Sequence, residues 1–438
     1  MMYGTREESN RAGRFMLSPE IDALPGAGTY HSAVTSTGGP RGGREKLPAG
    51  IWVLGMVSMF MDISSEMIHA LLPVFLVTVL GASTLTVGLI EGVAEAIAAI
   101  TRVFSGVLSD WLRRRKLLTV IGYGLAAATK PMFALAGSIG LVVTARFLDR
   151  VGKGIRGAPR DALIADIAPP HLRGSSYGLR QSLDTVGAFI GPLAAIALMA
   201  LTADRFRTVF WIAAVPAAIA MVILVLGVHE PPRTDTTAPR IPLRLADLTR
   251  FTARFWAIIG VAALLTLARF SEAFLVLRAQ DVGLALTFVP LVMVVMNIAY
   301  SLTAWPAGVL SDRAGRSGVL MAGFAFLVIA DLILAFGATI PLTLLGVLFW
   351  GLHMGFTQGI LASIVADSAP PELRGSAFGF YNLALGIGML AASVIAGALW
   401  DHHGPRATFL AGAAFTILSF IGYLIARSRD RPAGAHRT

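Results

Sequence analysis

Acidic side chains recur at helical spacing inside two long apolar segments of this sequence. Asp62, Glu66 and His69 occupy positions i, i+4 and i+7, so they fall on one face of a helix. Glu91 and Glu95 repeat the i, i+4 spacing in the next apolar segment. An ionised side chain at the centre of a bilayer costs about 2.5 to 3.5 kcal/mol on insertion scales, so each one needs a reason to be there. Binding and releasing a proton is one reason, and a structural hydrogen bond is the alternative.

A third acidic position lies further along the chain. Asp184 follows Arg180 at i+4, and the two can form an ion pair within one helix. That structural pairing explains Asp184 at least as well as a role in proton transfer does. In order, the candidate proton-coupling residues are Asp62 and Glu66, then Asp184, then Glu91 or Glu95.

Other charged or amide side chains in apolar segments could bind a substrate or pair with these carboxylates. They are Arg146, Arg180, Arg269, Glu272 and Asn382. The sequence has no cluster with metal-ligand spacing, no nucleophile elbow and no catalytic dyad. We therefore expect a protein that is not an enzyme and that needs neither a metal nor a cofactor.

The composition places the chain in a membrane. Of its 438 residues, 55 % are hydrophobic and only 14 % are charged, and the mean hydropathy is +0.71. A soluble domain carries roughly 25 % charged residues, so most of this apolar surface must face lipid. The net charge of +10 comes from short basic clusters between apolar segments, which argues against a nucleic-acid partner. The chain has no cysteine.

Apolar segments of spanning length predict twelve transmembrane helices in two sets of six. The first set is expected near 52–80, 84–108, 117–136, 139–158, 176–201 and 208–228, and the second near 255–279, 286–310, 318–337, 341–362, 376–400 and 406–426. Basic residues fill alternate loops, the central connection and the C-terminal tail. By the positive-inside rule, both termini are cytoplasmic.

The two sets contain duplicated motifs. Gly106-Val-Leu-Ser-Asp110 recurs as Gly308-Val-Leu-Ser-Asp312, about 200 residues later, and a second motif repeats at almost the same offset. The copy at Gly106 continues into a basic run that includes Arg114 and Lys116, whereas the copy at Gly308 has only Arg313 and Arg316.

Twelve helices in two sets of six, together with this motif after the second helix, resemble the major facilitator superfamily. The resemblance covers roughly residues 50–428. It implies two six-helix bundles with a substrate cavity between them at mid-membrane, a symmetry for which this superfamily is a standard example. It also implies a gating motif, in which Asp110 pairs with a cation or a helix N-terminus on the cytoplasmic side. A simple basic topology anchor is the alternative for Arg113–Lys116. The gating residues are Gly106, Asp110, Arg114 and Lys116, with Gly308, Asp312 and Arg316 in the second copy.

Gly187, Gly191 and Pro192 form a Gly-x-x-x-Gly-Pro sequence in the fifth helix, similar to a motif of the drug/proton-antiporter branch. Glycines four apart allow close helix packing and proline kinks a helix, so plain packing is the alternative. This resemblance favours export. A weaker one, to a proton-transfer motif of the fourth helix, involves Arg146 with Gly152, Lys153 and Gly154. Alternatively, the basic cluster within Arg146–Asp161 binds an anionic substrate, or it belongs to a cytoplasmic loop in which aspartates pair with the basic residues.

The sequence therefore predicts a secondary transporter in the inner membrane, which exports a small organic molecule by proton-coupled alternating access. Alternatives are a proton-coupled importer of a small anion, with Arg146, Lys130 or Arg269 as counter-charge, and a non-transporting sensor on the same fold. The expected partners are lipid, protons and an unidentified solute, and the expected state is a monomer. The expected domains are a disordered tail at 1–47, bundles at 48–228 and 254–428, a central loop at 229–253 and a tail at 429–438. An overextended start codon accounts equally well for 1–47.

Overall fold

The structure is a computed structural model, and it describes residues 47–112, 114–169, 172–230, 250–369 and 374–428. Every regular element in these ranges is a helix, which confirms the predicted all-α class. The expected tails at 1–47 and 429–438 lie outside the described residues except for Leu47, as does most of the expected central loop.

The helices follow one another with short connections. The first half contains α1 (Ala49–His69), α2 (Leu72–Thr78), α3 (Thr84–Leu112), α4 (Arg115–Leu135), α5 (Ile139–Ile167), α6 (Arg173–Leu201) and α7 (Phe206–Gly227). The second half contains α8 (Ala253–Ala268), α9 (Ala273–Asp281), the short 3-10 helix η3 (Leu286–Phe288), α10 (Leu291–Ala314), α11 (Arg316–Phe336), α12 (Ile340–Ser368), α13 (Arg374–His403) and α14 (Pro405–Ser428).

The expectation of one unbroken helix at 52–80 and at 255–279 is wrong. The first is divided into α1 and α2, with Pro73 in the first turn of α2, where its missing N–H has no helical partner to lose. The second is divided at Arg269–Glu272, where the Ser271 N–H bonds to the Ser393 hydroxyl of α13 at 3.2 Å instead of continuing the helix. Tertiary contacts thus accompany the break before α9.

Ten of the described helical segments are long and apolar enough to cross a membrane, with α1–α2 and α8–α9 each forming one of them. The long helices α3 and α5 are not among these ten. α5 also continues to Ile167, past the predicted end near 158. Most of its charged residues are buried inside the protein, and this makes so polar a helix compatible with a bilayer.

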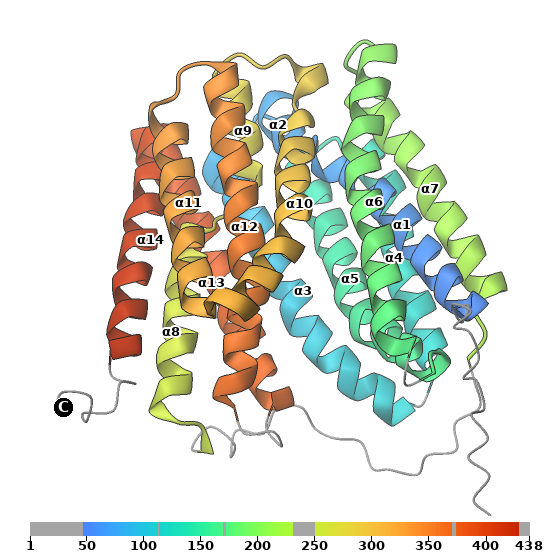
Figure 1. The fold of residues 1–438 in the computed structure, drawn as a ribbon. Helices are drawn as coiled ribbons and strands as arrows, with labels where there is room; N and C mark the ends of the chain where they lie inside the picture. Colours follow the sequence, from blue (N-terminus) through green and yellow to red (C-terminus); the bar gives the residue numbers. More distant parts are fainter. Residues whose placement is uncertain (1–46, 113, 170–171, 231–249, 370–373, 429–438) are drawn as a thin grey trace, which may run out of the picture. The chain divides into compact units, whose positions relative to one another are not determined.

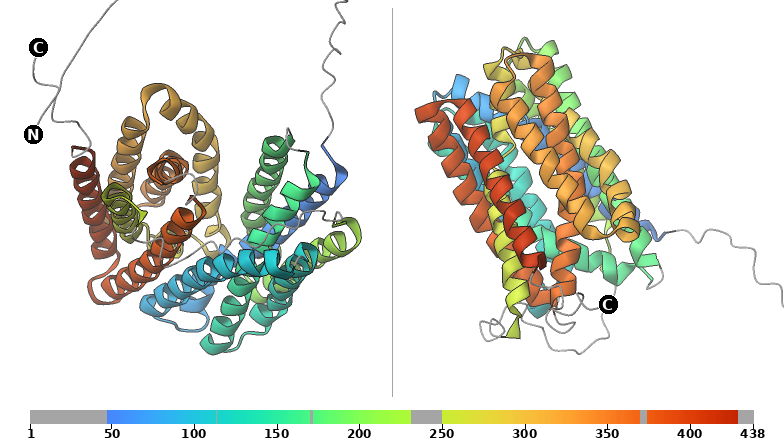
Figure 2. Two further views of the ribbon diagram at one scale, coloured as in Figure 1. Left: turned by 90° about the horizontal axis from the view of Figure 1, so that it is seen from below. Right: turned by 60° about the vertical axis from the view of Figure 1, so that its left-hand side comes forward.

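Helices α1 and α4 to α7 pack mainly within a first group that includes α3, and helices α8, α10 to α12 and α14 pack mainly within a second group that includes α13. Figure 1 and the left-hand view of Figure 2 show these as two groups of helices. Contacts between the groups come chiefly from α3 with α13 and from α6 with α10, while the short α2 and α9 meet each other. Glycines allow the closest approach: a Cβ at Gly88 would collide with the Ser393 carbonyl oxygen of α13.

Polar contacts join the two groups at the end of the molecule where α2 and α9 lie (Figure 1). The carboxylate of Asp401, at the end of α13, accepts hydrogen bonds from the backbone N–H groups of Thr84 at 3.0 Å and Leu85 at 2.9 Å, and from the Thr84 hydroxyl. A carboxylate at a helix N-terminus satisfies free N–H groups and complements the helix dipole. Asp204 adds a bond from the Thr287 hydroxyl at 2.6 Å. We call this set of contacts the α3–α13 latch.

Removing the Asp401 carboxylate should weaken the contact between α3 and α13 at this end of the molecule, so that the interface opens more often. The substitution Ser393→Cys provides a reporter, because position 393 is fully buried against Gly88 and the chain has no cysteine of its own. In that background, Asp401→Ala removes several charge-assisted bonds across the interface. If the net loss is about 1.4 kcal/mol, the rate at which a maleimide labels the thiol should rise about tenfold.

The matched control is Asp281→Ala, because Asp281 pairs with Arg278 within α9 and makes no bond to the other group among the described contacts. If Asp401→Ala and the parent were labelled at equal rates, apolar packing alone would close this end.

Candidate functional site

Helix α5 carries a stripe of buried charge. Arg146, Asp149, Arg150, Arg156 and Arg160 are each no more than 6 % exposed. At about 3.6 residues per turn, these five positions fall on one face of the helix. Burying an ionised group costs several kcal/mol unless a partner compensates, so this face of α5 depends on its neighbours.

Glycines in α5 bring those neighbours close. A Cβ at Gly152 would lie 2.6 Å from the Gly122 carbonyl oxygen of α4, and one at Gly154 would lie 2.5 Å from Thr101 Cβ of α3. The Gly152-x-Gly154 sequence therefore permits the contacts through which α3 and α4 reach the charged face of α5. In this structure, the two glycines of the sequence that resembles a proton-transfer motif allow close helix packing.

The first charged cluster joins α1, α3 and α5. Arg146 Nη2 lies 2.5 Å from Glu91 Oε2, and both side chains are almost fully buried. His69 lies between two carboxylates, with Nδ1 3.6 Å from Glu66 Oε2 and Nε2 3.6 Å from Glu91 Oε2. Glu66 is the more open of the two acids, with its side chain 24 % exposed. The arrangement provides a route of titratable groups from the cavity-facing Glu66 to the buried Glu91.

The second cluster joins α4 and α5. Lys130, only 1 % exposed, donates to Asp149 Oδ1 at 2.9 Å and to the Ser65 hydroxyl at 3.0 Å. Next to it, Arg150 Nη1 lies 3.2 Å from Glu95 Oε1. Glu95 and Lys130 are thus held in ion pairs with α5.

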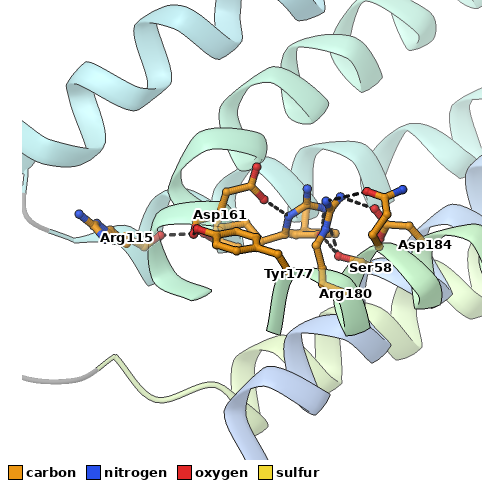
Figure 3. Close-up of polar contacts among 10 residues, drawn as sticks. Ser58, Arg115, Asp161, Tyr177, Arg180 and Asp184 are labelled. Carbon is orange, nitrogen blue, oxygen red and sulfur yellow. Dashed lines mark hydrogen bonds and ion pairs between the residues drawn. The ribbon is translucent and has the colours of Figure 1, made fainter. Parts of the chain in front are cut away.

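The third cluster lies toward the end of α5. Arg160 pairs with Asp161 at 3.1 Å and donates to Ser58 at 3.1 Å and Tyr123 at 3.3 Å, and the Arg156 guanidinium lies 4.6 Å from the centre of the Tyr123 ring. Figure 3 shows Ser58 and Asp161 in this cluster.

Arg180 and Asp184 form the predicted ion pair within α6, beside the third cluster (Figure 3). The same figure shows Tyr177, whose hydroxyl donates to the Asp161 carbonyl at 2.7 Å. Asp184 is therefore already compensated in this structure.

Helix α6 packs against the acidic face of α1 through its two motif glycines. A Cβ at Gly187 would lie 2.6 Å from the Met59 carbonyl oxygen and 3.0 Å from Asp62 Cβ. One at Gly191 would lie 2.7 Å from Glu66 Cβ. The Gly-x-x-x-Gly-Pro sequence therefore sets the distance between α6 and both leading candidate acids.

Two adjoining cavities lie between the helix groups. The larger, about 520 Å³, is lined by α1, α3, α5 and α6 on one side and by α10 and α12 on the other. The smaller, about 270 Å³, reaches the break between α8 and α9. Both include Glu66, Lys153, Ala188, Asn297 and Tyr300 in their walls, so they share a boundary. Volumes of this size suit a small organic molecule.

The cavities bring together most of the predicted site residues. Asp62, Glu66, Arg180 and Asp184 line the larger one, and Glu66, Glu91, Glu95, Arg269 and Glu272 line the smaller one. Arg146 lies behind this wall in its pair with Glu91. Asn382 is exposed on α13 and lines neither cavity.

The predicted gating residues lie away from the cavities. Gly106 packs against α5, because a Cβ there would lie 3.4 Å from Ala158 Cβ, whereas nothing lies within 4 Å of such an atom at Gly308. Lys116 donates to the Val225 carbonyl at 3.0 Å, and Arg316 pairs with Asp367. Arg114 is exposed. The side chains of Asp110 and Asp312 lie outside the described part of the structure.

Several cavity residues were not among the predicted site residues. Lys153, Arg156 and Arg160 belong to the basic cluster at the end of the fourth predicted helix, and nothing in the sequence singles out Tyr300. The signal for the first three is present in the sequence: charges from 146 to 160 recur every three or four residues, which predicts one helix face rather than a loop. Among the described residues, no group of three or more His, Cys, Asp or Glu is placed to hold a metal ion.

The Lys130–Asp149 pair gives a test of the charged face. Asp149→Leu alone leaves a buried ammonium group without its carboxylate and should destabilise the protein by about 3 to 5 kcal/mol. Adding Lys130→Met should restore most of that loss. Thermal unfolding in detergent measures both changes, and a double variant no more stable than the single one would show that the two residues are not coupled.

Comparisons with known proteins agree on one family. A family model described as Major Facilitator Superfamily matches residues 54–277 and 259–438. Uncharacterized MFS-type transporter MJ1317 of Methanocaldococcus jannaschii is 32 % identical over 382 residues, 86 % of this chain and 94 % of the relative. Quinolone resistance protein NorA of Staphylococcus aureus is 26 % identical over 217 residues, 50 % of this chain and 54 % of NorA.

A solved structure has the same fold. A point mutant of nucleoside transporter NupG superimposes with a TM-score of 0.74 at 14 % identity, over 86 % of this chain and 99 % of that one. At this identity the likeness concerns the fold alone. The chain belongs to the major facilitator superfamily.

Proposed function

We propose that this transporter exports a small organic molecule in exchange for protons by alternating access. The observation that carries the proposal is the position of Asp62 and Glu66, whose carboxylates line a cavity between two helix groups that the α3–α13 latch joins at one end. A site between two groups that can rock is the arrangement expected of a secondary transporter.

The basic loops give the proposed orientation. The run that ends in Arg115 and Lys116 lies at the end of the molecule opposite the latch. With this end cytoplasmic, as the positive-inside rule predicts, the structure is the state closed to the outside. Both termini are then cytoplasmic, in the inner membrane.

Asp62 is the leading proton site. Among the described residues it makes no hydrogen bond or ion pair, so it can take up a proton without first breaking one. Glu66 is the second site, and its proton can be shared with His69, which also contacts Glu91. A substrate cation and a proton would compete for the same carboxylates, and this competition is what exchange requires.

The packing of α6 offers a way for protonation to act on the conformation. Gly187 and Gly191 hold α6 against Asp62 and Glu66, and the Ala188 carbonyl accepts a bond from Asn297 of α10 at 3.5 Å. A change in charge or hydration at the two acids therefore acts on a helix that contacts the opposite group. In the outward-open state, we propose that the Gly106–Lys116 motif closes the cytoplasmic end.

Export is supported by the Gly187–Pro192 motif and by the similarity to NorA over half of the chain. Import of an anion is the second candidate. It is supported by the charge of the larger cavity, whose wall has five basic side chains and only three acidic ones. The direction of solute movement separates the two.

The test uses everted membrane vesicles with an acidic interior generated by respiration and a fluorescent pH dye. Addition of norfloxacin or another member of a panel of small organic acids and amines should release protons in the wild type. Asp62→Asn should abolish the release, whereas Asp281→Asn, outside the cavity, should not.

The export proposal would be contradicted if no compound of the panel changed the pH gradient more than it does in vesicles that lack the protein. Uptake of a labelled anion into right-side-out vesicles, increased by external acid, would favour import instead.

A further inference from the structure

We propose that the transported molecule is an organic zwitterion, whose amine binds Asp62 and whose acidic group binds Lys153 and Arg156. The inference rests on the proposed function, because it names the class of solute for the same cavity. It comes from the charged groups that the protein itself leaves without a partner.

Half of the charged side chains that line the larger cavity are already compensated within the protein. Arg180 pairs with Asp184, Arg160 pairs with Asp161, and Glu66 contacts His69. These groups fix the shape of the wall and have less to gain from a ligand. The groups that remain define what the cavity can recognise.

Three basic groups remain without a carboxylate. Among the described residues, Arg102, Lys153 and Arg156 make no ion pair within 4.0 Å, although all three line the larger cavity. Arg156 is 5 % exposed, and its Nη1 is buried without a hydrogen-bond partner. A buried donor without an acceptor costs about 1 to 3 kcal/mol, so an incoming carboxylate, phosphate or sulfonate would relieve that cost.

One acidic group also remains. Asp62 lines the same cavity and, among the described residues, has no cation within 4.0 Å, so it stands apart from both Lys153 and Arg156. An anion would satisfy only the basic groups, and a cation only Asp62. A molecule that carries both charges on one frame satisfies Asp62 and the basic groups at once.

The opposite wall indicates the rest of the molecule. Asn297, Tyr300 and Gln358 offer neutral polar groups from α10 and α12. The adjoining smaller cavity adds Phe270 and Trp350, which suit an apolar or aromatic body. The two walls together favour an organic zwitterion over a small inorganic ion.

The test is binding to the purified full-length protein in detergent, measured by calorimetry with matched probes. The zwitterion 4-(aminomethyl)benzoic acid is compared with its methyl ester, which is a cation, and with 4-methylbenzoic acid, which is an anion. The zwitterion should bind at least about tenfold more tightly than either, since each added charge pair contributes about 1.4 kcal/mol or more.

Two variants assign the charges. Lys153→Gln should weaken the zwitterion about tenfold and leave the cation unchanged, and Asp62→Asn should weaken the zwitterion and the cation alike. Arg406→Gln is the control, because Arg406 lies over the Phe336 ring and lines neither cavity.

Binding does not depend on transport, so the two proposals can fail separately. If the anion binds as tightly as the zwitterion and Asp62→Asn has no effect, the zwitterion proposal is wrong while proton-coupled export stands. If neither Lys153→Gln nor Asp62→Asn changes any affinity, the site itself is wrongly placed.

Discussion

The buried charge on α5 is the constraint on which the rest of the first half depends. A helix with four arginines and an aspartate on one nearly buried face can lie in a bilayer only if other helices supply counter-charges. Glu91 and Glu95 of α3 and Lys130 of α4 supply them, and they are held at ion-pair distance. The positions of α3 and α4 relative to α5 are therefore fixed by electrostatics as well as by apolar packing.

The same constraint explains why the cavity has a defined chemistry. Compensation along α5 is incomplete where the helix faces the opposite group, and there Lys153 and Arg156 make no ion pair with any described carboxylate. Asp62 is likewise without a described cation in the same cavity wall. The structure thus separates charges that stabilise the fold from charges that are available to a proton or a solute. Replacing one partner of a buried ion pair on α5, such as Asp149, should destabilise the protein, whereas replacing Lys153 or Asp62 should change binding.

The two halves differ in how they use polar residues. In the second half, the residues that match Arg180 and Asp184 at the repeat offset are Tyr381 and Leu385, and Gly308 has no close neighbour. This half supplies neutral polar and aromatic groups to the cavities, together with Arg269 and Glu272, and it supplies Asp401 to the latch. We propose that the first half couples transport to protons and recognises the charges of the solute. The second half shapes the cavity and contributes to closing the latch end.

Much of this organisation could be predicted from the sequence. Segment length and hydropathy indicated the all-α class, helical spacing indicated the acidic face of α1, and Gly187 with Gly191 marked a close helix contact. The rest depends on tertiary contacts. The break before α9 is stabilised by a bond to α13, and Asp401 meets Thr84 across most of the length of the chain, so no local pattern marks either. A cluster of charges such as that around Lys153 and Arg156 is typical of a cytoplasmic loop, and only its helical spacing indicates that both residues lie on α5.

The central claim, proton-linked alternating access, is tested most directly by distances between spin labels at the two ends. The cysteine-free chain allows one labelled pair at Leu201 and Phe288, near the latch, and another at Leu117 and Leu310, at the opposite end. Between about pH 5.5 and about pH 8, the account predicts reciprocal changes, one distance lengthening while the other shortens. The Asp62→Asn, Glu66→Gln double variant should show no response. Distances that change together, or a double variant that responds as the wild type does, would contradict it.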